Sequence, residues 1–188
     1  MKGVTVYCAS SPDAPAEFIA GARELGRLAA QAGLATISGA GCAGLMGAVV
    51  EGTLEVEGGT AVGVIPQFMV DRGWANPRMT ELHVVADMAE RKLMLADLGW
   101  GAIALPGGIG TLDELMDLLT RCQLGQYHRP VVILNLAGFY DNLIAQLEHA
   151  DACHMMRHFD LPGNLWQVAS TPARAISMIL DGNHSDAD

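Results

Sequence analysis

The sequence predicts a single doubly wound, Rossmann-like α/β domain, with a mainly parallel sheet and helices on both of its faces. Short apolar runs of strand length alternate with longer helical patterns from one end of the chain to the other. Most of these runs are apolar throughout, which is typical of parallel strands covered on both sides. At 188 residues, the chain is long enough to bury one full core. We therefore expect one domain over residues 1–181 and a polar, acidic tail without fixed structure at 182–188.

The first half of the chain holds three predicted strands and two predicted helices. Gly33 is placed to end the first helix in a left-handed conformation. Gly58 and Gly59 interrupt the chain before the third strand. The connection at 66–78 contains Trp74, and connections of this length are often lids or binding loops. The predicted strands are 4–9, 34–37 and 60–65, and the predicted helices are 16–32 and 45–57.

The second half continues the alternation with four further strands and four further helices. Asp87 and Glu90 form a capping-box pattern at the start of one helix. Thr171 followed by Pro172 is typical of the start of the last one. The segment at 151–164 has no decisive pattern. The predicted strands are 82–85, 101–105, 131–134 and an edge strand at 166–169, and the predicted helices are 88–98, 112–124, 139–150 and 172 to about 180.

Composition and charge exclude several classes of function. A formal net charge of −10 argues against nucleic acid or an anionic membrane as a partner, while still allowing one local site for a small anion. No apolar run reaches membrane length, and Met1 leads into a strand without a signal peptide. The four cysteines contain no Cys-x-x-Cys pair, which favours reduced thiols. We therefore expect a cytoplasmic protein.

The most informative stretch is the glycine-rich turn at 106–111, which joins an apolar strand to a helix. Gly107, Gly108 and Gly110 leave the backbone bare beside the first-turn N–H groups, where the helix dipole favours a phosphate. The turn matches neither Walker A nor Gly-x-Gly-x-x-Gly, and such turns are also common without a ligand. Because the carboxyl ends of parallel strands share one edge, we expect this turn to meet those at 10–11 and 39–44 around one ligand.

Two charged residues near this edge each allow a functional and a structural interpretation. A phosphate would repel the carboxylate of Glu114, so a functional Glu114 must point past the phosphate, toward the group that carries it. In the structural interpretation, Thr111 and Glu114 form a capping box. Arg91 shares a helical stripe with apolar residues, so its stem is drawn toward the core, and a partly buried arginine needs an anion. That anion is a ligand group or, structurally, Asp87 or Glu90 within one turn.

Together these residues resemble the Lonely Guy family, the cytokinin riboside 5′-monophosphate phosphoribohydrolases, which were often mislabelled lysine decarboxylases. The motif pair that carries the resemblance is Met88-x-x-Arg91-Lys92 followed by Pro106-Gly-Gly-x-Gly-Thr-x-x-Glu114. Supporting segments lie at 7–11, 44–48, 63–66, 80–85 and 123–130. The resemblance covers about residues 4–145.

The resemblance implies hydrolysis of the N-glycosidic bond of a nucleoside 5′-monophosphate, AMP or an N6-modified cytokinin AMP, to free base and ribose 5-phosphate. Glu114 would then stabilise the positive sugar or attack C1′, and Arg91 would orient Glu114 and the ribose phosphate. The resemblance also implies a homodimer with sites near the interface. The implied substrate-binding residues are Gly107, Gly108, Gly110 and Thr111 around the phosphate, with Met88, Lys92, Gly41 and Ser10.

Three features depart from the family pattern. The usual three glycines of the second turn are Gly39-Ala40-Gly41 here, and Ala40 disfavours positive φ and adds a methyl group near the ligand. Ala9 stands where glycine is common after the first strand, and the segment at 149–164 does not match the family. We expect these departures to affect which base is accepted more than the chemistry.

Other functions fit the sequence less well. The Cys/His cluster of His149, Cys153, His154 and His158 has spacing that suits a metal, but no supporting turn accompanies it, so we expect no metal and no cofactor. A pyridoxal phosphate enzyme needs a Schiff-base lysine, and Lys92, one of only two lysines, lies inside the Arg91 motif. A nucleotide sensor without turnover and an oligomeric scaffold are the alternatives. The sensor is disfavoured because binding alone needs no carboxylate beside the ribose.

Overall fold

The computed structural model describes residues 2–156 and 164–182. Within these residues the strands form one seven-stranded sheet in the order β4-β3-β2-β1-β5-β6-β7, and every neighbouring pair is parallel. The strands are β1 (Gly3–Tyr7), β2 (Ala35–Ser38), β3 (Ala61–Pro66), β4 (Glu81–Val85), β5 (Ala102–Ala104), β6 (Val131–Leu134) and β7 (Gln167–Ala169). The predicted parallel α/β fold is confirmed, and β7 lies at an edge as expected.

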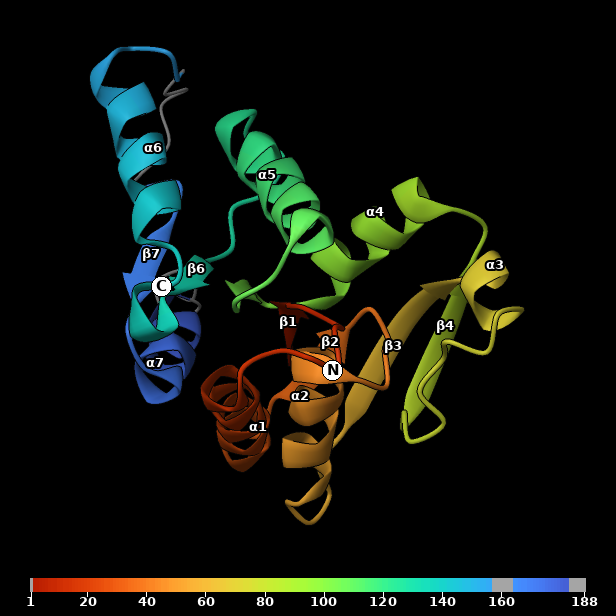
Figure 1. The fold of residues 1–188 in the computed structure, drawn as a ribbon. Coiled ribbons are helices and arrows are strands. Elements are labelled where there is room, and N and C mark those ends of the chain that lie inside the picture. Colours follow the sequence, from red (N-terminus) through yellow and green to blue (C-terminus); the bar gives the residue numbers. More distant parts are fainter. Residues whose placement is uncertain (1, 157–163, 183–188) are drawn as a thin grey trace.

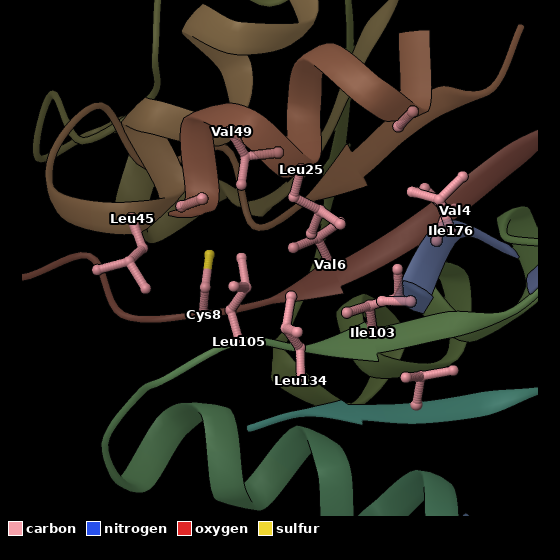
Figure 2. Packing of buried hydrophobic residues seen from close by; sticks show 14 of the residues in the cluster. Val4, Val6, Cys8, Leu25, Leu45, Val49, Ile103, Leu105, Leu134 and Ile176 are labelled. Carbon is pink, nitrogen blue, oxygen red and sulfur yellow. The ribbon is translucent and has the colours of Figure 1, made fainter. Parts of the chain in front are cut away.

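Helices cover both faces of the sheet (Figure 1). One core packs the sheet against α1, α2 and α7, and the other packs it against α4, α5 and α6. Figure 2 shows part of the first core, where Cys8 lies among apolar side chains such as Leu45 and Leu105. The helices are α1 (Ala16–Gln31), α2 (Gly44–Leu54), α3 (Gln67–Val70), α4 (Met88–Leu98), α5 (Ile109–Gln123), α6 (Asp141–Ala152) and α7 (Pro172–Gly182), with a 3₁₀ turn, η1, at Leu136–Gly138.

The predicted strands and helices all occur, with boundaries within three residues of the predicted ones. Two short elements, α3 and η1, were not predicted, because four- and three-residue helices are too short to show periodicity. The last helix continues to Gly182, and the tail beyond it lies outside the described residues. None of the described helices is long and apolar enough to cross a membrane.

The order of the strands determines where a ligand can bind. From β1 the chain winds outward to β4, and it then returns to the other side of β1 as β5, β6 and β7. The direction of winding therefore reverses between β1 and β5, and the loops after these two strands separate there. In doubly wound sheets such a switch point leaves a crevice at the carboxyl ends of the strands. The glycine-rich turn at 106–111 begins at this point.

Candidate active site

A cavity of about 670 Å³ lies at the switch point, within the usual size range of small-molecule sites. Three turns form most of it: the segment after β1, the α2 turn (residues 39–44) and the α5 turn (residues 106–111). The expected convergence of these turns on one site is confirmed. The predicted site residues that line the cavity are Ser10, Gly41, Met88, Arg91, Gly108, Gly110, Thr111 and Glu114.

Arg91 and Glu114 form a buried ion pair on the cavity wall. Arg91 Nη1 donates to Glu114 Oε1 at 3.0 Å, and Arg91 Nε donates to the carbonyl oxygen of Val64 at 3.1 Å. The two side chains are only 8% and 7% exposed. The structural interpretation expected Arg91 to pair with Asp87 or Glu90, and this is wrong. The guanidinium group pairs with Glu114 of α5 instead. Asp87 and Glu90 instead accept backbone N–H groups at the start of α4, as their pattern predicts.

The carboxyl group of Glu114 has a pKa well above the usual value for glutamate. Burial raises its pKa to about 7, although the Arg91 guanidinium opposes this shift. Asp113 adds to the increase, and Lys92 opposes it. A group with a pKa near the working pH can gain or lose charge readily as charge develops beside it. A buried carboxyl group with a pKa raised in this way, on the wall of a cavity, is a candidate functional group.

The α5 turn does not contain the capping box that its sequence allows. Helix α5 begins at Ile109 with Gly108 as its N-cap, so Thr111 lies inside the first turn and cannot cap it. No side chain caps this helix. Because Glu114 bonds to Arg91, the capping-box interpretation of Thr111 and Glu114 is wrong. The helix starts three residues earlier than predicted, at Ile109, so that Gly110 lies in its first turn. Its first-turn N–H groups have no side-chain cap, and Gly108, Gly110 and Thr111 line the cavity at this end.

The α2 turn has a different construction. Ala40 adopts φ 60°, so the expectation that it would avoid positive φ is wrong. Its carbonyl oxygen accepts from the backbone N–H of Asn76 at 2.8 Å, which holds this conformation. Its methyl group is fully buried and faces Gly63 of β3, where an added Cβ would lie 2.7 Å from it. The methyl group is therefore accommodated by a glycine in the sheet, rather than added near the ligand as expected.

An apolar wall that the sequence did not predict as a whole completes the cavity. Met46, Met69 and Trp74 lie on it together with the predicted Met88. Trp74 and Met69 belong to the connection between β3 and β4, which had been identified as a candidate binding loop from its length. The only sequence signal for Met46 was its place in the supporting segment at 44–48. In the structure its sulfur accepts the N–H of Gly41 at 2.9 Å.

Two predicted substrate-binding residues are not among the described residues that line the cavity. Gly107 belongs to the α5 turn, but a Cβ added to it would collide with the side chain of Thr111 rather than enter open space. The ammonium group of Lys92 pairs instead with Asp113 at 3.1 Å and Asp117 at 3.4 Å. The structure thus separates these two residues from the eight that face the cavity.

The Cys/His cluster is only partly described. His149 and Cys153 approach one another, with the sulfur 3.7 Å from Nε2, and His158 lies outside the described residues. Within the residues that the structure describes, no group of three or more potential ligands could hold a metal ion. The absence of a metal requirement therefore stays a prediction.

Comparisons with known proteins agree with the motif pair. A family model described as "Possible lysine decarboxylase" matches residues 46–179. The chain is 41% identical over 150 residues to a cytokinin riboside 5′-monophosphate phosphoribohydrolase of Rhodococcoides fascians, covering 79% of this chain and 75% of the relative. It is 40% identical over 155 residues to a protein of the same name from Mycobacterium marinum, with 82% of each chain covered.

Among solved structures, the molybdenum cofactor carrier protein of Chlamydomonas reinhardtii superposes with a TM-score of 0.75. The superposition covers 98% of this chain and 99% of that protein, at 23% sequence identity. At this identity the likeness establishes the doubly wound fold.

Proposed function

Because the chain belongs to the family of the cytokinin riboside 5′-monophosphate phosphoribohydrolases, we propose that it hydrolyses the N-glycosidic bond of a nucleoside 5′-monophosphate. The products are the free base and ribose 5-phosphate. One observation carries this proposal: the buried Arg91–Glu114 pair lies on the wall of a cavity whose rim is the uncapped N-terminus of α5. An anion site beside a buried carboxylate suits a substrate that carries a phosphate and develops positive charge.

The phosphate binds at the α5 turn in this proposal. Backbone N–H groups and the helix dipole attract an anion there, and Gly108 and Gly110 leave room for it. Thr111 lines the same part of the cavity and supplies a hydroxyl group. The ribose then extends from the phosphate toward Glu114. The base lies along the apolar wall of Met46, Met69, Trp74 and Met88, which suits adenine or an N6-isoprenoid adenine.

Glu114 stabilises the sugar as the bond to the base breaks. Cleavage of a glycosidic bond passes through an oxocarbenium-like state with positive charge near C1′. A carboxylate fixed beside that position is most effective when it is buried and held in place, because the low dielectric strengthens the attraction. Arg91 holds Glu114 by one nitrogen and the carbonyl of Val64 by another, so the carboxylate cannot swing away. Lys92 and Gly107 are not assigned to the substrate.

We further propose a cytoplasmic homodimer that needs no metal and no cofactor. Ile109, at the start of α5 and beside the cavity, is 88% exposed, which supports coverage by a second copy near the site. A nucleotide sensor that uses the same cavity is the alternative function. The buried Arg91–Glu114 pair favours the hydrolase, since binding of a nucleotide gains nothing from a partly ionised carboxylate near the ribose.

The test is turnover of AMP and N6-isoprenoid AMP by the full chain, with and without a chelator, assayed as free base and ribose 5-phosphate. Replacement Glu114→Gln keeps the shape of the side chain and removes its charge, and should lower kcat by about 10²–10³. Circular dichroism and AMP binding should stay at wild-type values in this variant. Base release at the wild-type rate by Glu114→Gln would contradict the catalytic role of Glu114. Binding of AMP without any base release by the wild-type protein would favour the sensor.

A further inference from the structure

A second ion pair joins α4 to α5 directly outside the first. Lys92 follows Arg91 on α4, and Asp113 precedes Glu114 on α5. Lys92 Nζ donates to Asp113 Oδ1 at 3.1 Å and lies 3.4 Å from Asp117 Oδ1. The two helices lie side by side on the same face of the sheet (Figure 1). They are therefore linked twice by neighbouring residues, once inside the cavity wall and once outside it.

We propose that Lys92 and Asp113 are positioning residues, whose outer ion pair fixes α4 against α5 and sets the charge state of Glu114 without touching the substrate. This inference rests on the proposed function for its meaning in turnover. It replaces the substrate-binding role that the motif alone implies for Lys92. The outer pair is partly solvated, with side-chain exposures of 21% for Lys92 and 52% for Asp113. The inner pair is buried, so the two pairs differ in environment but share the same two helices.

The two members of the outer pair shift the pKa of Glu114 in opposite directions. Burial and the guanidinium of Arg91 have the largest effects on the pKa of Glu114, as described above. Next, the carboxylate of Asp113 raises this pKa and the ammonium of Lys92 lowers it. Lys92 remains charged because, although burial opposes its charge, the hydrogen bond to Asp113 and the nearby aspartates outweigh burial and raise its pKa.

Two further titratable groups interact with Glu114, one at the end of β1 and one directly after it, and both stay neutral. Burial raises the pKa values of Tyr7 and of the adjacent Cys8, and the charge of Glu114 raises both further. Asp117 pairs with Lys92 and Arg121, but it is not among the groups that shift the pKa of Glu114. Lys92 and Asp113 are therefore the charged residues outside the cavity that shift the pKa of Glu114. Asp117 belongs to the same set of ion pairs without this effect, so a variant of Asp117 serves as a control.

The experiment measures the pKa of Glu114 in the ligand-free protein by carbon-13 NMR of its side-chain carboxyl group, with Glu114→Gln to assign the signal. Replacement Lys92→Gln removes a positive charge and should raise the pKa by about half a pH unit, the effect of a unit charge several ångströms away when water screens most of the interaction. Replacement Asp113→Asn removes a negative charge and should lower the pKa by about as much. Lys92→Arg and Asp117→Asn should leave the pKa close to the wild-type value.

Both charge-removing variants break the same outer ion pair, so a purely structural pair would move the pKa in the same direction in both, or not at all. Either result would overturn the proposal. Opposite shifts support it, and if Lys92→Gln does not fold, Lys92→Met takes its place in the comparison with Asp113→Asn. The titration needs no turnover, so it stands even if the proposed function fails. Where AMP is hydrolysed, the acid limb of kcat/KM should follow the same order among the variants, because the substrate phosphate titrates equally with each of them.

Discussion

The two glycine-rich turns at the carboxyl edge of the sheet use glycine for opposite purposes. In the α5 turn, a Cβ added at Gly108 or Gly110 would meet nothing within 4 Å. In the α2 turn, a Cβ added at Gly39 would collide with the guanidinium of Arg91. The first turn is therefore open toward the cavity, and the second is already filled by protein side chains. Both turns line the same cavity.

This difference shows that glycine content alone does not define a ligand cradle. An open glycine leaves backbone N–H groups for a ligand, whereas a filled one lets another part of the protein approach the backbone. In this protein the filled turn places Arg91, and the open turn faces the space that Arg91 and Glu114 border. Removing glycine should therefore impair catalysis in the α2 turn and ligand binding in the α5 turn.

The largest expected effect concerns the open turn and its phosphate. We predict that kcat/KM for AMP exceeds that for adenosine by about 10²–10⁴, since two charge-assisted hydrogen bonds contribute about 3–6 kcal/mol. The comparison uses the same protein preparation and assays free adenine from both substrates. A ratio near one would mean that the α5 turn holds no phosphate during catalysis. The contrast between the two turns would then lose its functional meaning.

A smaller but still large effect is expected from Gly39→Ala in the filled turn. The new methyl group would displace the Arg91 guanidinium and break the contact that holds Glu114. We predict that kcat falls by about 10²–10³, the usual cost of losing a preorganised charged partner. Circular dichroism should show an unchanged fold. Wild-type kcat in this variant would show that the position of Arg91 is not important for turnover.

The sequence predicted the architecture well, and it singled out Arg91 and Glu114, which the structure brings together on the cavity wall. Continuous apolar strands and their alternation with helices define a doubly wound sheet, and the edge where its turns meet follows from the parallel arrangement. A charged residue on an apolar stripe and a carboxylate after a glycine turn drew attention to Arg91 and Glu114, and the resemblance to the family then gave them their expected roles. Such conflicts with simple local rules are expected at functional sites.

What the sequence could not predict depends on contacts between distant residues. The motif contains Arg91 and Lys92 side by side, but their side chains lie on different sides of α4, one in the cavity wall and one in the outer ion pair. The positive φ of Ala40 depends on a hydrogen bond from Asn76 and on space at Gly63. The apolar wall combines Met46 with residues of a later loop. Each of these features depends on residues far apart in the sequence, so no local hydrophobic pattern predicts it.

The smallest expected effect comes from Gly110→Ala in the open turn, and it should separate stability from binding. Gly110 is the second residue of α5 and has no neighbour that an added Cβ would strike. Alanine in a helix is more stable than glycine by about 0.5–1 kcal/mol, so Tm should rise by about 1–4 °C. The methyl group also narrows the space beside the first-turn N–H groups, so KM for AMP should rise severalfold. Adenosine turnover should not change, because adenosine has no phosphate to place there. An increase in Tm without any change in KM would mean that the phosphate binds elsewhere in the cavity.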